Sequence, residues 1–412
     1  MTTQPVTDWA PRAQRLADLL VAHGDVHHPA WRSAVAGVPR HIFVPAAYQQ
    51  DGIGTWQPVD VTSPSGLDLV YTPTTFITAV VDGGTHQEAV SSSTKPDLML
   101  RMLEALDVHD GHKVLEIGTG TGYNAALLSH RLGANLVFSV DIDPELVHSA
   151  RNRLHTIGFR PTLVSADGAG GLPEHAPFDR IIATCSVPAV PWAWAEQLRV
   201  GGKILVDVKV AREAGNLVLL HRHPDRLEGR FTARWGSFMA MRHHHDDTSA
   251  SPHPRSEGTR RRTTTIPPHP WWDHRLVWLL AQFQGLPADV HIGMHLDPDT
   301  RKPTASFLST PDGSWVAVSL TGSQGQYDVL EGGPTALWDS LERAHQVWLA
   351  HEQPEWTRLG LTVTPQRQRL WIDTPAGTSW SLPPRSQNRT GSTLGDLKPR
   401  PTISGRPASM SM

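Results

Sequence analysis

The stretch Val114-Leu-Glu-Ile-Gly-Thr-Gly-Thr-Gly-Tyr-Asn124 decides the fold of this chain of 412 residues. It predicts a buried strand over 113–117, a loop with three alternating glycines, and a helix over 124–132. Glycine is needed where the backbone turns with unusual dihedral angles and lets a ligand approach closely. The N-terminus of the following helix presents free N–H groups. The stretch therefore predicts a strand–loop–helix unit that binds a ligand at its loop.

The alternation of strand and helix continues along the chain from this unit. An amphipathic helix is predicted over 96–106 before it. After it, a helix is predicted over 144–157, and strands are predicted over 136–140, 161–165, 180–184 and 203–208. Strands that alternate with helices are typical of parallel βαβ units, so the fold class is α/β with a doubly wound sheet.

Composition narrows the kinds of partner that this chain can have. Lys and Arg number 37 against 40 acids, so no basic excess favours nucleic acid. The single cysteine, Cys185, excludes an internal disulfide framework, fits a reducing compartment and is expected to be a core residue. No apolar run approaches the ~18 residues of a membrane span, and no secretion signal begins the sequence. We expect a cytoplasmic protein without nucleic-acid or membrane partners; its oligomeric state is left open.

The second half of the chain has a different composition from the first. Ten of the 15 tryptophans lie at Trp235 or beyond. A helix is predicted over 271–284 and an amphipathic helix over 335–351, and alternating patterns over 304–320 and 359–383 predict antiparallel strands. We expect four parts: a doubly wound domain with an N-terminal helical extension (1–245), a linker (246–270), an α+β, β-rich accessory domain for peptide recognition (271–385), and a disordered tail (386–412).

Two charged runs lie in or beside the predicted linker. His243-His-His-Asp-Asp247 carries metal-ligand residue types, but adjacent ligands in a flexible segment lack fixed geometry, so no metal site is predicted. Arg260-Arg-Arg262 is expected to be a solvated run.

Acidic residues near the glycine loop indicate which ligand it binds. The G-x-G-x-G spacing differs from the G-x-G-x-x-G that binds a dinucleotide pyrophosphate. Glu116 would repel a pyrophosphate but could bind an amino group, which points to a ligand with an amino-acid end, such as S-adenosylmethionine. Asp141 and Asp167 close the next two strands, where they could meet the ribose hydroxyls and the adenine amino group. The alternative is three loop acids beside a tight turn without a ligand. The predicted cofactor-binding residues are Glu116, Gly118, Thr119, Gly120, Gly122, Asp141, Ile142, Asp167 and Gly168.

Residues from about Val38 to Arg242 resemble the protein-L-isoaspartate (D-aspartate) O-methyltransferases. The matching segments are VPRHIFVP (38–45), KVLEIGTGTGYNAALL (113–128), VFSVDIDPELVHSARNRL (137–154), ADGAGGLPEHAPFDRIIAT (166–184) and LRVGGKILV (198–206). The resemblance implies the class I S-adenosylmethionine methyltransferase fold and transfer of a methyl group to a carboxylate.

Repair enzymes of this family carry a serine in a Gly-Gln-Thr-Ile-Ser-x-Pro stretch, and this chain departs from it. The corresponding stretch here is Ala89-Val-Ser-Ser-Ser-Thr-Lys-Pro96, which places Thr94 at the family serine, with Ser93 beside it. A carboxylate is ionised near neutral pH, so its methylation needs alignment and hydrogen-bond donors rather than a strong base. Thr94 and Ser93 are the predicted catalytic residues, and Ser91 and Ser92 are further candidates for substrate contact. The alternative is an ordinary helix N-cap, which favours Ser and Thr.

The length of the chain and its diverged Ser/Thr stretch suggest a branch of the family. Repair enzymes commonly end soon after the α/β core. The extension here, with the segments 331–338 and 359–363, resembles the isoaspartyl-methyltransferase-like enzymes of ribosomal peptide pathways, above all the graspetide branch beside the lanthipeptide and lasso-peptide ones. That resemblance implies esterification of an Asp in a modified precursor peptide, giving aspartimide or isoaspartate. A repair methyltransferase and a non-catalytic cofactor- or peptide-binding module remain as alternatives.

Overall fold

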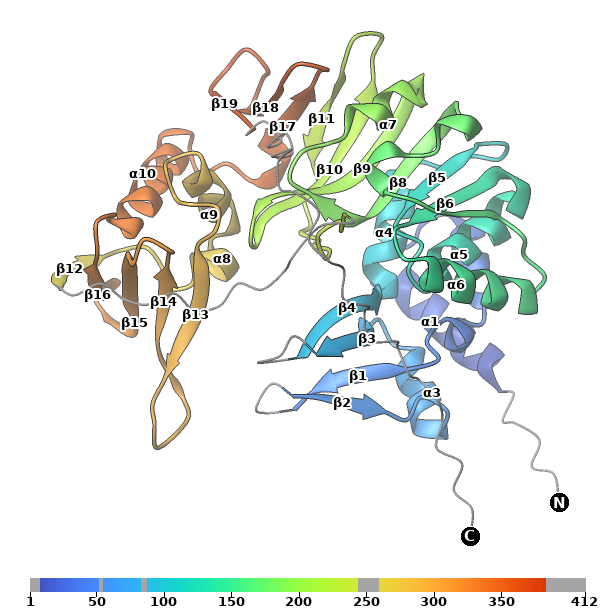
Figure 1. The fold of residues 1–412 in the computed structure, drawn as a ribbon, viewed down its shortest axis with the longest axis horizontal. Coiled ribbons are helices and arrows are strands. Elements are labelled where there is room, and N and C mark those ends of the chain that lie inside the picture. The colour runs from blue at the N-terminus through green and yellow to red at the C-terminus, as the bar shows by residue number, and fades with distance from the viewer. Residues whose placement is uncertain (1–7, 52–54, 83–86, 244–258, 383–412) are drawn as a thin grey trace, which may run out of the picture. The chain divides into compact units, whose positions relative to one another are not determined.

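A mixed sheet of ten strands forms the centre of the fold in the computed structural model (Figure 1), which describes residues 8–51, 55–82, 87–243 and 259–382. Its order is β19-β18-β17-β11-β10-β9-β8-β5-β6-β7, and the pairs among β7, β6, β5, β8 and β9 are parallel. The parallel strands are β5 (Val114–Ile117), β6 (Val137–Asp141), β7 (Thr162–Ser165), β8 (Phe178–Val187) and β9 (Leu198–Ala211). The helices beside them are α4 (Pro96–Ala105), α5 (Tyr123–Leu132), α6 (Pro144–Thr156) and α7 (Trp192–Glu196). The predicted α/β class is therefore confirmed.

Alternating side chains of the parallel strands enter two separate apolar cores. Leu115 and Ile117 pack in one core, which also contains Trp194 of α7. Val114 packs in the other core, which also contains Leu127 of α5 and Leu100 of α4. Successive strand residues point to opposite faces, so a strand buried on both faces is apolar at nearly every position. This is why VLEI was recognisable as a central strand.

The N-terminal region forms a second, smaller sheet that the sequence patterns did not predict. Its strand order is β2-β1-β3-β4, and all its pairs are antiparallel. The elements of this region are α1 (Trp9–Ala22), α2 (Pro29–Gly37), β1 (Ala47–Gln50), β2 (Trp56–Val59), α3 (Pro64–Val70), β3 (Phe76–Asp82) and β4 (Gln87–Ser93). Strand β4 leads directly into α4, so this small sheet delivers the Ser/Thr stretch to the main fold (Figure 1).

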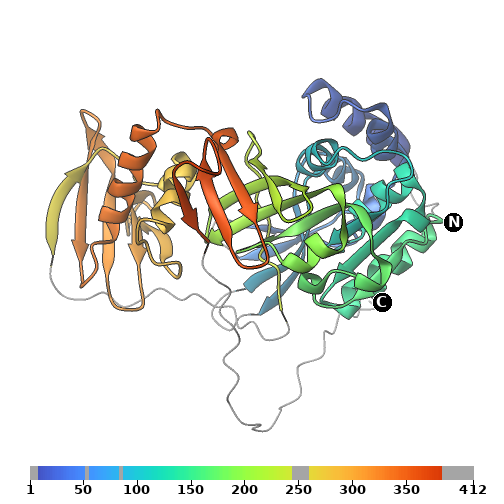
Figure 2. The same cartoon turned by 90° about the horizontal axis from the view of Figure 1, so that it is seen from above.

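The C-terminal half contributes to two sheets. Strands β10 (Ala214–Arg222) and β11 (Leu227–Phe231) continue the main sheet, and β17 (Leu359–Val363) pairs with β11, followed by β18 (Gln368–Ile372) and β19 (Ser379–Ser381). Figure 2 shows these last strands beside β11. A separate five-stranded sheet has the order β12-β16-β15-β14-β13, and helices α8 to α10 belong to the same region. Their bounds are β12 (Arg260–Thr264), α8 (Pro270–Asp273), α9 (Arg275–Gln282), β13 (His291–Leu296), β14 (Pro303–Ser309), β15 (Trp315–Ser323), β16 (Gln326–Gly332) and α10 (Leu337–Ala350).

Two expectations for this half need correction. Arg260–Thr264 is an edge strand inside the interval 246–270 expected as linker, and Arg262 forms ion pairs with Glu331, Asp339 and Glu342 rather than being solvated. The helix expected over 271–284 is broken at His274 into α8 and α9. Residues 244–258 and the expected disordered tail lie outside the described residues.

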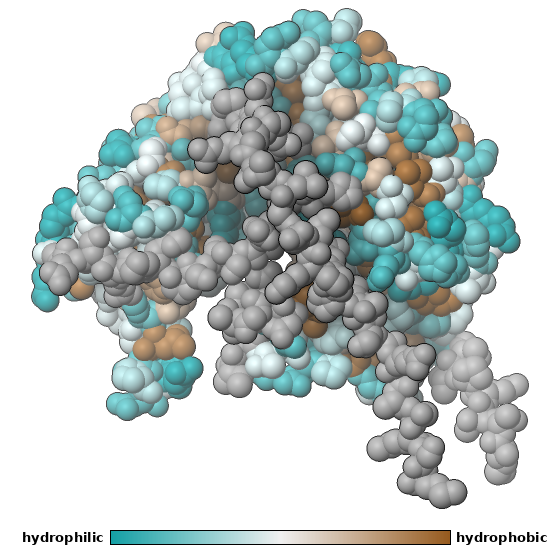
Figure 3. Space-filling model, in the orientation of Figure 1, coloured by the Kyte–Doolittle hydropathy of each residue, from teal (hydrophilic) through white to brown (hydrophobic). Residues whose placement is uncertain are grey.

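Apolar residues reach the surface in scattered positions on the face shown in Figure 3. Large exposed apolar side chains among the described residues include Val200 and Trp272, which are distant in sequence. Isolated apolar residues of this kind are normal on a folded protein.

Candidate active site

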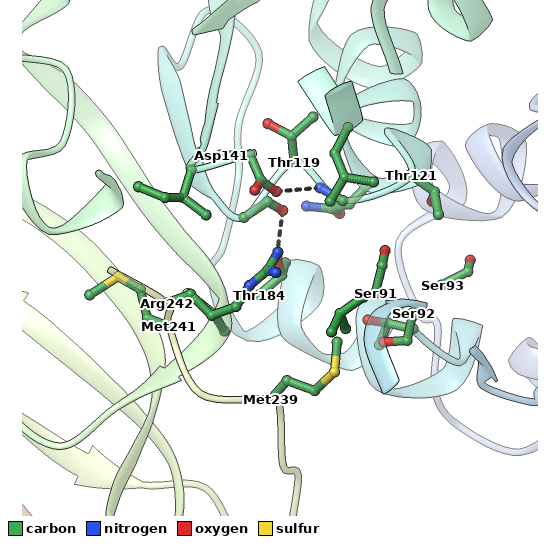
Figure 4. Close-up of a pocket in the computed structure, with 18 of the residues that line it drawn as sticks. Ser91, Ser92, Ser93, Thr119, Thr121, Asp141, Thr184, Met239, Met241 and Arg242 are labelled. Carbon is green, nitrogen blue, oxygen red and sulfur yellow. Dashed lines mark hydrogen bonds between the residues drawn. The ribbon is translucent and has the colours of Figure 1, made fainter. Parts of the chain in front are cut away.

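A cavity of about 830 Å³ lies at the carboxyl ends of the parallel strands. In an open α/β sheet this edge is where ligands bind. Its lining comes from the glycine loop after β5, the ends of β6 and β8, the end of β4, and residues 239–242. Figure 4 shows Thr119 and Thr121 of the loop, Ser91 to Ser93, and the labelled residues of 239–242 around this space. The structure therefore brings the predicted cofactor loop and the predicted Ser/Thr stretch to one site.

The glycine loop is held by side chains from both neighbouring strands. The Gly120 N–H donates to Oδ2 of Asp141 at 2.9 Å, and the Thr184 hydroxyl donates to the Gly118 carbonyl at 2.6 Å. Gly120 has φ of 51°, and a Cβ built there would point into open cavity, with its nearest contact the Ser92 carbonyl at 3.8 Å. A side chain at position 120 would thus occupy ligand space.

Gly122 has a different role from the other loop glycines. Its φ is 91°, it precedes α5 as the N-cap, and it is not among the residues that line the cavity. A Cβ at this position would lie 3.1 Å from Cβ of Ala150 on α6. Gly122 therefore allows α5 and α6 to approach closely. This is a packing role, whereas the sequence predicted a contact with the cofactor.

Glu116 lies at the base of the cavity with both carboxylate oxygens engaged. It is 1% exposed, and it accepts hydrogen bonds from Asn124 Nδ2 at 2.8 Å and Ser139 Oγ at 2.6 Å. Burial raises the pKa of Glu116 to about 7, against the lowering effect of these two hydrogen bonds. The Ser139 hydroxyl also shares a hydrogen bond with the hydroxyl of Thr119 at 2.7 Å. Glu116 is therefore connected to the glycine loop through Ser139.

The ends of β6 and β7 place the other two predicted acids differently. Asp141 and Ile142 line the cavity. Asp167 does not, although Gly168 beside it does; one Asp167 oxygen accepts the Ala169 N–H, and the other lies 2.8 Å from Nδ1 of His243. Seven of the nine predicted cofactor residues thus line the cavity, whereas Gly122 and Asp167 do not.

The Ser/Thr stretch is the end of a strand rather than the start of a helix. Ser91, Ser92 and Ser93 are the last residues of β4, and they and Thr94 line the cavity. Ser91 shares a hydrogen bond with Thr78 at 3.0 Å. The Ser93 hydroxyl oxygen is buried and has no hydrogen-bond partner among the described residues. The N-cap of α4 is Lys95, without a side-chain cap, so the alternative of a Ser/Thr helix cap is wrong.

Arg40, which the sequence did not single out, fixes the backbone around this strand end. Its side chain is fully buried, and its guanidinium donates to the carbonyls of Val70, Thr72 and Thr74 at 2.6 to 2.8 Å and to that of Thr94 at 3.5 Å. Burial lowers the pKa of Arg40 to about 10, which leaves it charged at neutral pH. The sequence signal that could have identified Arg40 is the segment VPRHIFVP, in which Arg40 and His41 are flanked by apolar residues.

Residues 239–242 form a cavity wall that sequence patterns also missed. Met239, Ala240, Met241 and Arg242 follow no recognisable helix or strand period, yet all four line the cavity. Cys185 is another lining residue, and burial together with nearby acids raises the pKa of its thiol above its usual range, so it is not a thiolate nucleophile.

The described residues contain neither a metal-binding cluster nor a membrane-spanning helix. Within 8–51, 55–82, 87–243 and 259–382, no group of three or more His, Cys, Asp or Glu side chains could hold a metal ion. Over the same ranges, no helix is long and apolar enough to cross a bilayer. Most of the run 243–247 lies outside them.

Comparison with known proteins gives one consistent result. The family model for protein-L-isoaspartate(D-aspartate) O-methyltransferase matches residues 67–232. A protein-L-isoaspartate O-methyltransferase of Gloeobacter violaceus is 36% identical over 193 residues, which are 47% of this chain and 80% of that protein. Protein-L-isoaspartate O-methyltransferase 1 of Archaeoglobus fulgidus is 34% identical over 198 residues, which are 48% of this chain and 77% of that protein.

A solved structure of a protein-L-isoaspartate O-methyltransferase has a similar fold. The TM-score is 0.52 at 20% identity, and the match covers 88% of this chain and 100% of that one. The likeness in fold therefore extends beyond the half that the sequence relatives match, and the length of the chain does not by itself argue against the repair alternative. The chain belongs to the protein-L-isoaspartate O-methyltransferase family, whose members transfer a methyl group from S-adenosylmethionine to a carboxyl group.

Proposed function

We propose that this chain methylates a carboxylate of a peptide or protein substrate in the cavity between the glycine loop and the end of β4. The observation that carries the proposal is the convergence of Gly120, Asp141 and the unpartnered hydroxyl of Ser93 on one space. Ser93 lines the cavity, so a carboxylate bound there would give its buried hydroxyl the partner that the described residues do not supply.

The residues at the cavity fit S-adenosylmethionine. The volume of about 830 Å³ falls in the range of small-molecule sites. Asp141 at the end of β6 would hold the ribose, Ile142 and Gly168 would contact the adenine, and Gly118 and Gly120 would lie against the methionine end, above Glu116. When bound, the cofactor supplies an electrophilic methyl group.

The chain's own contribution to transfer is positioning and exclusion of water. A carboxylate needs no base near neutral pH, so hydroxyls that hold one of its oxygens leave the other aimed at the methyl group. Ser93 and Thr94 would be these donors, with Ser91 and Ser92 along the same strand end. The buried Ser93 hydroxyl acts where competing water is absent, which strengthens its hydrogen bond.

An isoaspartyl carboxylate is the first substrate class to test, because the named relatives are protein-L-isoaspartate O-methyltransferases. The purified chain and S-adenosylmethionine would be incubated with two synthetic peptides that differ only in one isoaspartyl or aspartyl linkage. We expect mass spectrometry to show a methyl ester, or the succinimide formed from it, on the isoaspartyl peptide alone. Modification of neither peptide would contradict this substrate class.

A second candidate is an aspartate of a modified, ribosomally made peptide. The observation in its favour is the substrate-facing strand, where Ser-Ser-Ser-Thr (91–94) replaces the Gly-Gln-Thr-Ile-Ser stretch of the repair enzymes. In the same assay a cyclised precursor peptide, methylated at Asp in preference to the linear isoaspartyl peptide, would favour this candidate. Binding of the cofactor without transfer to any of these carboxylates would instead favour a binding module.

A further inference from the structure

The charges that line the cavity are unevenly distributed. Glu116 and Asp141 are its acids toward the cofactor loop, and Arg242 is the only basic residue among the described residues of its lining. No hydrogen bond or ion pair joins the Arg242 side chain to any other residue in the described part of the chain, whereas its neighbour His243 is paired with Asp167. A half-buried guanidinium without a partner in a concave site is suited to binding an anion.

Hydrogen bonds to β8 and β9 hold the backbone segment that precedes Arg242. Ser186 at the end of β8 donates its N–H to the Met239 carbonyl and accepts the Met241 N–H, both at 2.8 Å. Just before this, the Phe238 N–H donates to Oδ2 of the buried Asp207 at 2.9 Å. These bonds attach 238–241 to β8 through one isolated parallel bridge between Ser186 and Ala240. Figure 4 shows the Arg242 side chain extending from this segment into the cavity, in the direction of Thr184.

The order of strands indicates which anion Arg242 meets. Along the sheet the order is β7, β6, β5 and β8, and residues 239–241 lie beside β8. The proposed ribose and adenine contacts belong to β6 and β7, and the glycine loop belongs to β5. The neighbours of Arg242 reach the end of β7, where His243 pairs with Asp167 and a Cβ on Gly168 would lie 3.5 Å from the Met241 sulfur. The Arg242 side chain instead extends toward Thr184 of β8, so it meets the glycine-loop side of the cavity rather than the adenine side (Figure 4).

We infer that Arg242 binds the acceptor carboxylate of the substrate and thereby selects carboxylate over amide side chains; this inference rests on the proposed function. A guanidinium matches a carboxylate in a bidentate geometry that no lysine reproduces. Esterification removes the negative charge, so the same contact that recruits the substrate weakens for the product. Arg242 thus sets specificity and favours product release, while the hydroxyls of β4 align the attacking oxygen.

The test measures binding and turnover separately. Calorimetry on protein saturated with S-adenosylhomocysteine would use a synthetic isoaspartyl peptide and its analogue with a carboxamide in place of the acceptor carboxylate. We expect Arg242→Gln to weaken binding of the carboxylate peptide about 10-fold or more, to the level at which the wild type binds the carboxamide. Arg242→Lys should restore this binding only in part, and the affinity for S-adenosylhomocysteine should stay within about 3-fold of wild type.

Arg160→Gln is the matched control, because Arg160 is exposed and lies outside the cavity lining. In turnover, Arg242→Gln should raise KM with little change in kcat. Equal binding of the carboxylate peptide by wild type and Arg242→Gln would overturn the inference, as would a loss confined to S-adenosylhomocysteine. Wild-type protein that binds the peptide through Arg242 but transfers no methyl group would overturn the proposed function alone. No binding of the peptide by the wild type would overturn both.

Discussion

The hydroxyl of Ser93 is buried at the end of β4 and has no partner among the described residues. Removing it by mutation would show whether Ser93 contacts the substrate or has only a structural role. Ser93→Ala is expected to keep the free energy of unfolding within about 1 kcal/mol of wild type or to raise it, because an unsatisfied hydroxyl is lost. The same change should lower kcat/KM about 10-fold or more, since the substrate carboxylate loses a donor. Chemical denaturation and a methyl-transfer assay would measure the two effects.

Ser129→Ala serves as the control for this prediction. The Ser129 hydroxyl is equally buried and unpartnered among the described residues, but Ser129 lies on α5 outside the cavity lining. It should show the same small change in stability and full activity. A Ser93→Ala variant as active as Ser129→Ala would contradict a substrate role for Ser93.

Glu116 makes the stability of the ligand-free protein depend on pH. Burial raises its pKa from an ordinary 4.5 to about 7, so the folded chain binds this proton more tightly than the unfolded chain does. The contribution of Glu116 to the free energy of unfolding therefore falls between about pH 4.5 and 7, by at most about 3 kcal/mol. Glu116→Gln lacks this titration, and its stability relative to wild type should rise across that window. Denaturation curves at several pH values that stayed parallel for the two proteins would contradict the assignment.

At the scale of the element, the glycine loop combines a ligand surface with a helix contact. Gly120→Ala would place a methyl group in open cavity, whereas Gly122→Ala would place one 3.1 Å from Cβ of Ala150. Both glycines have positive φ, which costs other residues about 1–2 kcal/mol. We expect Gly120→Ala to weaken S-adenosylhomocysteine binding about 10-fold or more, and Gly122→Ala to lose more stability but to bind within about 3-fold of wild type when folded. Calorimetry below the Tm of each variant would decide, and the reverse pattern would show that Gly122 is the ligand contact.

The loop and β4 also show how far sequence patterns reach at this scale. The strand, glycines and helix of 113–132 were predictable because apolar period and glycine spacing are local signals. The small sheet of β1 to β4 was not predictable from these signals. Its strands are half exposed, and they form only by pairing with one another across the sequence. The Ser/Thr stretch lines the cavity, as a substrate contact requires, and the alternative of a helix cap is wrong. That alternative arose because a helix cap and a strand end both accommodate small polar residues.

Some site residues could not be predicted because their roles depend on tertiary contacts. Arg40 binds four carbonyls that lie 30 to 54 residues away in sequence. Arg242 reaches the cavity only because 238–241 is bonded to β8 and to Asp207. Asp167 follows the expected pattern of acids at strand ends, but that pattern could not predict its pairing with His243, which is distant in sequence.

At the scale of the whole molecule, the C-terminal strands are part of the methyltransferase sheet. Strand β17 pairs with β11, and Leu361 of β17 is fully buried in the same core as Ile117. Leu361→Asp should therefore lower the free energy of unfolding by about 3–5 kcal/mol, because it buries an unpaired charge. Val200→Asp, at a position that is 64% exposed, should change it by less than about 0.5 kcal/mol.

Hydrogen exchange would show whether the effect reaches the catalytic half. In Leu361→Asp, amides of β10 and β11 should exchange faster than in wild type. Unchanged protection of these strands would mean that residues 359–381 unfold independently of the main sheet, as expected if they belong to a separate accessory domain over 271–385. That division stays a prediction.

The central claim is that this cavity makes a carboxyl ester, and the fate of a labelled methyl group tests it most directly. The chain would be incubated with S-adenosylmethionine carrying a labelled methyl group and with the isoaspartyl peptide, and the product would then be exposed to mild base. We predict that the label appears on the peptide with wild-type protein, is strongly reduced with Gly120→Ala, and is released as methanol by base. Label that stays on the peptide through base treatment, as on nitrogen, carbon or sulfur, would contradict the claim.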